Sequence, residues 1–335
     1  MGAVYNPSLV HESTLSVAPA FGELEPHRAE LTAYCYRMLG SPFDAEDAVQ
    51  DAFVRAWRSR DRFEGRAAMR SWLYRIATNV CLDMLKSRAR RARPMDLAPA
   101  VEPLESNLNA RSAKEWIEPI PETLIAPDAD PADVAVERES VRLAFVAALQ
   151  QLPARQRATL ILREVLRWEA SEVAELLDTT VASVNSALQR GRATLAKSNL
   201  STSDPLPALS EADRAMLERY VAAFEKYDMD ALTSLIREDA SQSMPPYDMW
   251  LFGRDDILAW WVGPGNGCRG SRVIPTISAN GMPTFAQYKP SPQGGYDPWA
   301  LQVLELSDGR ISEFTFFLDT ERFFPLFGLP LHLDS

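Results

Sequence analysis

The sequence predicts a multidomain protein in which two all-α blocks, the second with a helix-turn-helix, precede an α+β domain. Apolar residues recur at the spacing of an α-helix, with few glycines, over residues 21–93 and again over 137–199. An acidic, proline-rich segment, 94–136, separates the two blocks and is predicted to be a linker without a core of its own. From residue 210 to 335, glycine, proline and aromatic residues increase, and strand-like segments flank a hairpin-turn sequence. A chain of 335 residues suits two or three domains.

The charge of the chain is unevenly distributed. The formal net charge of −11 argues against a uniformly basic nucleic-acid binder, since phosphate contacts need lysine and arginine. Basic residues nevertheless cluster at two places, Lys86, Arg88, Arg90, Arg91 and Arg93 in the first block and Arg190, Arg192 and Lys197 in the second. Local basic patches, more than net charge, decide DNA affinity, so these two clusters are compatible with DNA binding.

Cysteine usage and hydropathy indicate the compartment. Cys35, Cys81 and Cys268 lie far apart without a CxxC pair, so the sequence predicts neither a zinc knuckle nor a disulfide framework. The sequence has no apolar run of membrane-spanning length and no signal-peptide pattern. We therefore expect a cytoplasmic protein with no membrane partner, no metal and no cofactor.

The first block follows a polar stretch, 1–20, that is predicted to be a flexible tail. Residues 44–57 form an amphipathic helix whose predicted buried face is Ala48, Ala52, Phe53, Ala56 and Trp57. Acidic residues crowd its start, where the helix dipole favours anions, and the simplest interpretation of that cluster is a solvated helix terminus.

A second helix, 71–85, carries a predicted buried stripe of Leu73, Ile76, Ala77, Val80 and Met84 and then enters the first basic cluster. Trp72, Tyr74 and Asn79 are predicted to be exposed beside it. Such residues can stack on unpaired bases and hydrogen-bond them while the basic end holds phosphates. The alternative is that Trp72 and Tyr74 pack in the core.

Residues 24–93 resemble the second conserved region of sigma-70 family sigma factors. The resemblance depends on Asp44-Ala-Glu-Asp-Ala-Val-Gln-Asp-Ala-Phe53, Trp57 and Arg70-Ser-Trp-Leu-Tyr-Arg-Ile-Ala-Thr-Asn79. In that family the first helix docks on a coiled coil of RNA polymerase, which implies polymerase contacts by Asp47, Gln50, Asp51, Arg55 and Trp57. The following loop and helix capture the melted minus-ten promoter element. The candidate contacts there are Arg62, Arg66, Arg70, Trp72, Tyr74, Asn79, Lys86 and Arg90.

The pattern of the second block predicts a helix-turn-helix. A short helix over 171–177, a turn at 178–180 and a longer helix over 181–195 give a predicted buried stripe of Val181, Val184, Leu188 and Leu195. The predicted exposed face is Thr180, Ala182, Ser183, Asn185, Ser186, Gln189, Arg190 and Arg192. Small and amide side chains at the helix start can enter the major groove, and the arginines can reach phosphates. The alternative is an ordinary helical hairpin with a polar face.

The Leu-Pro-x-x-Gln-Arg-x-x-x-x-Leu pattern at 152–162 resembles the fourth conserved region of sigma factors, which reads the minus-thirty-five element. The two blocks without further conserved regions resemble the compact extracytoplasmic-function (ECF) group, over about residues 24–199. This resemblance implies a transcription initiation factor whose partners are core RNA polymerase and promoter DNA. A separate anti-sigma protein is left open. So are two other functions, a stand-alone helix-turn-helix regulator and an enzyme or ligand sensor centred on the last domain.

After a short linker, 200–209, the last domain resembles SnoaL-like domains, which are related to ketosteroid isomerases. The resemblance depends on Val221-Ala-Ala-Phe224, Asp228-Met-Asp-Ala-Leu232, Gly253-Arg-Asp-Asp-Ile257 and Ile311-Ser-Glu-Phe314. It implies a cone-shaped α+β fold with helices first and a curved antiparallel sheet after them. His332 is the sole histidine of the domain and lies in its tail, and the candidate carboxylates Asp248, Asp297, Glu313 and Asp319 are typical of turns or solvated positions. We therefore expect no catalytic residue.

Aromatic residues of the last domain are either a core or the lining of a pocket for a small apolar ligand. They are Trp250, Trp260, Trp261, Phe285, Trp299 and Phe316. We expect residues 208–335 to pack on the two sigma blocks, to set their spacing and to modulate their activity. The acidic excess of the chain can compete with DNA for the basic faces.

Overall fold

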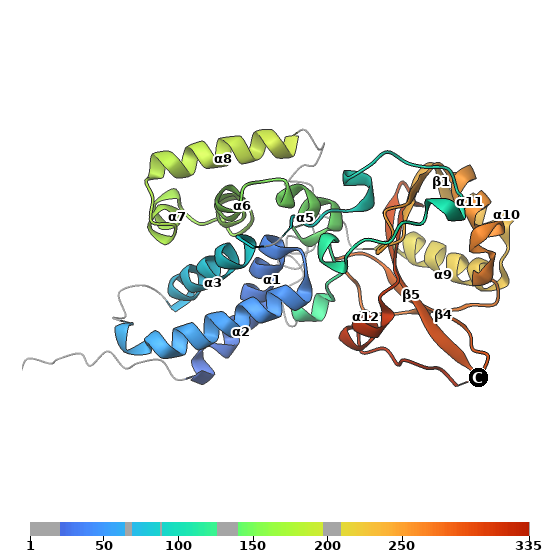
Figure 1. Cartoon of the computed structure of the whole chain (residues 1–335), viewed down its shortest axis with the longest axis horizontal. Coiled ribbons are helices and arrows are strands. Elements are labelled where there is room, and N and C mark those ends of the chain that lie inside the picture. The colour runs from blue at the N-terminus through green and yellow to red at the C-terminus, as the bar shows by residue number, and fades with distance from the viewer. Residues whose placement is uncertain (1–20, 64–68, 88, 126–139, 197–208, 335) are drawn as a thin grey trace, which may run out of the picture.

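The computed structural model describes residues 21–63, 69–87, 89–125, 140–196 and 209–334 (Figure 1). The predicted tail 1–20 and the side chains of Arg66, Arg88 and Lys197 lie outside the described residues, as does the side chain of Arg62. In the described part of the chain, the structure contains no helix long and apolar enough to cross a membrane.

The first helical block consists of two short 3-10 turns, η1 (Phe21–Glu23) and η2 (Glu25–His27), three helices and a further 3-10 turn. The helices are α1 (Arg28–Leu39), α2 (Pro42–Ser59) and α3 (Met69–Leu85), and η3 (Arg60–Arg62) follows α2. Gly40 ends α1 with a φ of 73°, a conformation that favours glycine. Ser41 then caps α2 by accepting a hydrogen bond from the Asp44 amide at 3.3 Å. The two helices therefore pack as a tight antiparallel pair on α3.

Two predictions about this block are wrong. Trp57 is 40% exposed, because it directly follows Ala56, the last buried residue of α2, and points about 100° away from it around the helix. Tyr74 is fully buried, which confirms the core-packing alternative and not the placement on the exposed side of α3. Helices of the second block cover the face of α3 that carries Tyr74. The hydrophobic periodicity of α3 contains no information about this cover. The remaining predicted stripe holds, with Leu73, Ala77 and Val80 buried and Ile76 and Met84 half-buried.

The second helical block contains α5 (Leu143–Gln150), α6 (Ala154–Leu160), a π-helical turn η8 (Ile161–Val165), α7 (Ala170–Leu176) and α8 (Val181–Ala196). The predicted helix-turn-helix corresponds to α7 and α8. Val181 was predicted to be buried and is 43% exposed. It lies in the first turn of α8, before the packed stripe begins at Val184.

The described part of the predicted linker, 94–125, has a packing role that the sequence did not reveal. It forms four 3-10 turns, η4 (Pro94–Asp96), η5 (Glu105–Asn107), η6 (Ala113–Glu115) and η7 (Glu122–Leu124). Ile117, Ile120 and Ile125 are buried in a core shared with both helical blocks. Pro121 forms a β-bridge with Ala279 of the last domain. Proline and acidic residues are frequent in this segment, yet the three buried isoleucines are what pack it against both blocks.

The last domain combines helices with a six-stranded sheet of order β2-β1-β6-β5-β4-β3. Its helices are α9 (Glu211–Lys226), α10 (Met229–Leu235), α11 (Arg254–Val262) and α12 (Thr320–Leu326), with a 3-10 turn η9 (Pro264–Cys268). Its strands are β1 (Ile236–Ser243), β2 (Trp250–Phe252), β3 (Arg272–Pro275), β4 (Thr284–Pro290), β5 (Tyr296–Ser307) and β6 (Arg310–Phe317). The sheet is mixed, because β1 and β6 pair in parallel. The predicted antiparallel arrangement holds for the other neighbouring strands.

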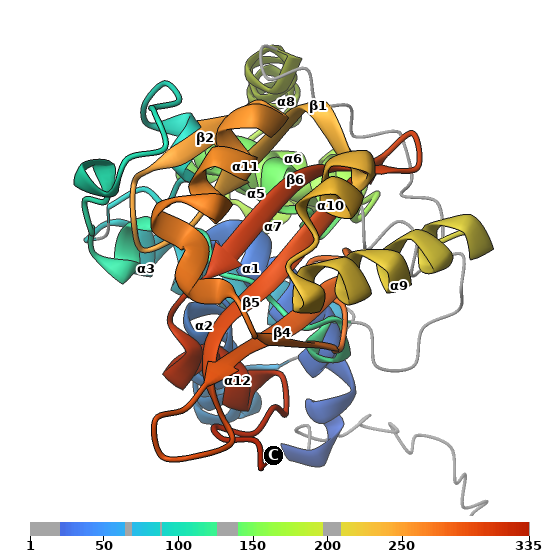
Figure 2. The ribbon, with the colours of Figure 1, turned by 90° about the vertical axis from the view of Figure 1, so that its right-hand side faces the viewer.

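The two faces of this sheet have different neighbours. Helices α9, α10 and α11 cover one face, as Figure 2 shows, and enclose a core that includes Tyr220, Phe224 and Phe314. The opposite face bears Ala286, Leu301, Val303 and Phe317, which join the core of the helical blocks and the linker. The sheet is therefore the layer through which the last domain packs on the rest of the described chain.

Candidate polymerase and promoter interface

The five predicted polymerase contacts lie on the solvent side of α2. Asp47, Gln50, Arg55 and Trp57 are exposed, and Asp51 is half-buried. The Arg55 guanidinium pairs with Asp51 at 2.8 Å and with Asp83 of α3 at 3.5 Å. These ion pairs orient the charged side chains along one surface.

An apolar residue belongs to the same surface and was missed by sequence reasoning. Val54 is 43% exposed and lies between Asp51 and Trp57 on α2. The Arg60 guanidinium stacks on the Trp57 ring at 4.2 Å, which holds the indole against the helix end. Val54 could have been found from the sequence, because it is an apolar residue that lies outside the predicted buried face of the helix. The resulting surface combines an exposed aromatic, an exposed aliphatic and fixed charges, a composition typical of protein interfaces.

The predicted minus-ten residues fall into two groups. Asn79, Lys86 and Arg90 are exposed and face solvent together with the start of the basic cluster. Trp72 is half-buried, with its ring 5.0 Å from that of Phe63. An amide and two cations are thus accessible, and one predicted aromatic is partly covered.

Arg70 and Tyr74 are instead engaged by the second helical block. The Tyr74 ring lies 5.1 Å from the ring of Trp168, which precedes α7, and its hydroxyl donates to Glu30 Oε2 at 3.3 Å. The Arg70 guanidinium lies over both rings, at 5.2 Å from Tyr74 and 5.6 Å from Trp168. In this arrangement Tyr74 is shielded from a base, whereas Arg70, which also pairs with Glu30 at 2.7 Å, stays exposed.

Further contacts, one of them buried, join the two helical blocks. The Arg157 guanidinium of α6 donates to the Met38 carbonyl of α1 and to Gln150 Oε1. Burial lowers the pKa of Arg157 to about 10, so the guanidinium stays protonated at neutral pH. Arg75 of α3 pairs with Glu175 of α7 at 3.1 Å. The blocks therefore form one packed unit here.

The predicted minus-thirty-five face is open. Thr180 and the seven predicted residues of α8 that follow it are exposed, and α8 lies at the edge of the molecule in Figure 1. The Thr180 hydroxyl caps the helix by accepting from the Ser183 amide at 3.1 Å. Arg192 pairs with Glu164 at 2.6 Å, a partner that sequence reasoning missed. This face can enter a major groove without rearrangement inside the second block.

The four candidate carboxylates of the last domain each have a basic side chain as partner. Asp248 pairs with Arg111 at 3.1 Å, Asp297 with His332 at 3.0 Å and Asp319 with Arg322 at 3.2 Å. Glu313 lies 3.8 Å from Arg93, and burial raises the pKa of its carboxyl. Arg93 and Arg111 lie outside the last domain, so two of these pairs attach preceding segments to it.

The six aromatic residues considered for a ligand pocket do not line a common cavity. Trp260, Trp261, Phe285 and Phe316 belong to the core between the sheet and its helices. The Trp250 indole donates to the Ala98 carbonyl of the linker at 2.8 Å. Trp299 is exposed, with the Lys289 ammonium 3.1 Å from its ring centre. The alternative stated for these residues, a packed core, is confirmed for the four buried ones.

Comparisons with known proteins agree with this division of the chain. The family models "Sigma-70 region 2", "Sigma-70, region 4" and "SnoaL-like domain" match residues 24–91, 142–195 and 217–314. The chain is 44% identical over 310 residues to the ECF RNA polymerase sigma factor SigG of Mycobacterium tuberculosis (strain H37Rv), which covers 91% of this chain and 82% of that protein.

A second relative is more distant. Identity to the ECF RNA polymerase sigma factor SigJ of the same strain is 31% over 220 residues, 65% of this chain and 62% of that protein. The crystal structure of M. tuberculosis SigJ shares the fold, with a TM-score of 0.60 at 21% identity, covering 93% of this chain and 100% of that one. The chain therefore belongs to the ECF group of sigma-70 family sigma factors, which direct RNA polymerase to promoters and are not enzymes, and it carries a SnoaL-like domain after region 4.

Proposed function

We propose that the C-terminal domain of this sigma factor holds regions 2 and 4 in a closed arrangement, and that transcription requires their release. In the released state α2 contacts core RNA polymerase, α3 captures the opened minus-ten strand and α8 reads the minus-thirty-five duplex. The exposed faces of α2 and α8 and the exposed Asn79 support these assignments.

A geometric argument supports the need for release. Elements named minus ten and minus thirty-five are about 25 base pairs apart, or roughly 85 Å of duplex at about 3.4 Å per base pair. Here α3 packs directly on α6 and α7, and the side chains of both regions share one hydrophobic core. Two modules packed in this way cannot reach both elements at once.

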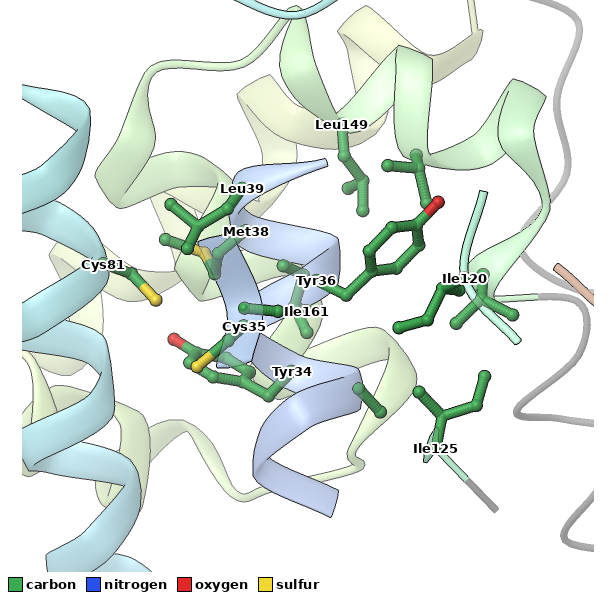
Figure 3. Close-up of a cluster of buried hydrophobic side chains, with 14 of the residues drawn as sticks. Tyr34, Cys35, Tyr36, Met38, Leu39, Cys81, Ile120, Ile125, Leu149 and Ile161 are labelled. Atoms are coloured by element: carbon green, nitrogen blue, oxygen red, sulfur yellow. The ribbon is translucent and has the colours of Figure 1, made fainter. Parts of the chain in front are cut away.

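Asn280 carries the proposal. This buried residue of the C-terminal domain donates from Nδ2 to the Tyr36 hydroxyl of α1 and to the Val141 carbonyl at the start of region 4, both at 2.6 Å. Its Oδ1 accepts from the Ile120 amide of the linker at 3.1 Å. Figure 3 shows Tyr36 among the side chains of the linker and α5. One side chain thus joins region 2, the linker and region 4 to the C-terminal domain.

Two carboxylates of the sheet hold the ends of the linker. Glu305 and Glu313 face each other across β5 and β6, where like charges repel. Arg93, just after region 2, lies 3.8 Å from Glu313, and Arg142, at the start of region 4, pairs with Glu305. The arginines relieve the repulsion while they are docked. In this proposal acidic residues act on the two arginines that flank the linker, and not on the predicted basic face of α8, which stays open.

A third attachment joins α12 to region 2. The Arg322 guanidinium pairs with Glu118 of the linker at 2.8 Å and lies 4.2 Å from the Phe43 ring centre at the start of α2. Glu118 is buried and also accepts a hydrogen bond from the Ser41 hydroxyl that caps α2. The helix that carries the predicted polymerase contacts is thus tied to the C-terminal domain at its first turn.

Run-off transcription with core RNA polymerase tests the proposal. Asn280→Ala removes the four-way contact, and Asn266→Ala, at an exposed position of η9, is the matched control. We expect more transcript from Asn280→Ala than from the wild type, and wild-type output from Asn266→Ala. Unchanged or lower output from Asn280→Ala, with normal polymerase binding, would contradict inhibition by the closed arrangement.

A further inference from the structure

A cavity of about 480 Å³ lies where the linker crosses the C-terminal domain. One wall is formed by Trp116 and Glu118 of the linker. The opposite walls come from Pro245–Tyr247, from Trp299 at the start of β5, and from the segment Phe317–Phe323 that leads into α12. Because linker residues form a wall, the cavity is complete only while the linker is docked.

This cavity is distinct from the interior of the SnoaL-like domain. The interior between sheet and helices is occupied by a chain of buried side chains, in which the Tyr220 hydroxyl donates to Gln302 at 2.8 Å and Gln302 donates to Gln287 at 2.9 Å. Along β6, Phe314 and Phe316 point into that interior. Phe317 faces the other side of the sheet and lines the cavity. The cavity therefore lies on the sheet face that contacts the sigma regions.

The lining of the cavity is mostly aromatic and proline, with a few polar groups. Both oxygens of Glu118 are engaged, Oε1 by Arg322 and Oε2 by Ser41. Asp319 accepts from Arg322 through Oδ2 at 3.2 Å, and among the described residues Oδ1 has no hydrogen-bond partner. The Tyr247 hydroxyl likewise has no partner in the described part of the chain. One carboxylate oxygen and one phenol thus remain for an occupant.

We propose that this cavity binds a flat, largely apolar aromatic molecule of two or three fused rings that bears a hydroxyl or amine donor. The rings contact the aromatic and proline walls, and the donor bonds to Asp319. Pockets of this size with few polar groups are typical small-molecule sites. A molecule that binds only when Trp116 and Glu118 are docked stabilises the docked linker by mass action. The regulatory consequence rests on the function proposed above, whereas binding itself does not.

Isothermal titration calorimetry of the full-length protein with 2-naphthol tests the site. We expect saturable binding to one site with a Kd of about 0.1–1 mM, as is usual for a molecule of this size. Ala113→Trp places a large side chain in the cavity and is expected to weaken binding by about tenfold or more. Lys114→Trp, at the neighbouring position that does not line the cavity, is expected to bind as the wild type does.

Two further arms test the ligand class and the coupling. Naphthalene-2-sulfonate has no donor and a negative charge, so we expect it to bind about tenfold more weakly beside Asp319 and Glu118. Saturating 2-naphthol is expected to slow hydrogen exchange of the linker amides near Trp116.

Each arm has a result that overturns the proposal. Equal affinities of Ala113→Trp and Lys114→Trp would place the molecule elsewhere. Tighter binding of the sulfonate would reject the donor-bearing class, and unchanged exchange would reject coupling to the linker. None of these readouts uses transcription, so they are independent of the outcome for Asn280→Ala.

Discussion

The Asn280 amide donates a 2.6 Å hydrogen bond to the Tyr36 hydroxyl, which joins the C-terminal domain to the first helix of region 2 across 244 positions of sequence. The Tyr36 hydroxyl in turn donates to the Glu118 carbonyl of the linker at 2.8 Å. Each group in this buried network depends on its neighbour for a partner. The network is therefore sensitive to the loss of one member.

Asn280→Ala is expected to lower the free energy of unfolding by about 1–3 kcal/mol. The change leaves the Ile120 amide without its acceptor and the Val141 carbonyl without its Asn280 donor in a region without solvent access. Asn280 also has a φ of 56°, which asparagine tolerates better than alanine does. Urea unfolding followed by circular dichroism measures the change. Asn266→Ala should stay within about 0.5 kcal/mol of the wild type, and equal losses in both variants would contradict the role of Asn280.

Glu313 is expected to make stability depend on pH. Burial raises the pKa of its carboxyl above the ordinary 4.5, and Arg93 partly opposes this rise. A raised folded-state pKa contributes stability that is fully present below about pH 4.5 and is lost as pH rises through the raised value. Glu313→Gln should remove this slope, and Arg93→Gln should extend it to higher pH. Urea midpoints between about pH 4.5 and 7 measure it, with exposed Glu238→Gln as control. A slope that survives in Glu313→Gln would assign it to another group.

Asn79→Ala is expected to impair promoter opening more than polymerase binding. Asn79 is exposed on α3, where an amide can bond an unpaired base. Loss of one such contact corresponds to about a tenfold lower yield of open complex. Permanganate reactivity of the melted strand measures opening, and a binding assay with core polymerase provides the comparison. A parallel loss of both activities would count against a base contact.

Arg190→Ala is expected to weaken binding to minus-thirty-five duplex and to reduce the salt dependence of binding by about one counterion. Arg190 is exposed on the open face of α8. Titration of duplex at several salt concentrations measures both effects. Arg214→Ala, an exposed arginine of α9, is the control and should leave affinity and slope unchanged. The placement of α8 in the groove would be wrong if the two variants behaved alike.

Trp57→Ala is expected to reduce affinity for core polymerase by about tenfold or more, because exposed aromatic side chains at interfaces are frequent hot spots. The exposed Val54 beside it should have a smaller effect when replaced by alanine. Phe252→Ala removes an exposed aromatic side chain from the C-terminal domain, away from the cavity, and serves as control. Equal affinities of Trp57→Ala and Phe252→Ala for polymerase would remove α2 from the interface.

The helices of regions 2 and 4 could be predicted because their signals are local. The spacing of Ala48, Ala52 and Ala56 places one face of α2 inside, although the helix starts at Pro42, after the Ser41 cap, two residues before the predicted start. Tyr74 was misplaced because its cover, Trp168, comes from another region. Periodicity describes one helix and contains no information about what packs against its other side.

The contacts that join the domains are similarly invisible in the sequence. Asn280 is a single asparagine in a loop, and its role arises only when α1, the linker and region 4 meet around it. Composition described the linker as acidic and proline-rich, whereas Ile117 and Ile120 decide where it packs. The parallel pairing of β1 and β6 also depends on distant segments, since turn signals predict only antiparallel neighbours.

The shared core of the sheet, the linker and the sigma regions has an energetic consequence for the order of assembly. Opening the molecule exposes Ile117, Ile120 and the outer face of the sheet to water, and this is unfavourable for the isolated chain. In the proposed release, the free energy for opening comes from the contact with polymerase. Engagement of both promoter elements would accordingly follow enzyme binding, and a free molecule would hold duplex DNA through α8 alone.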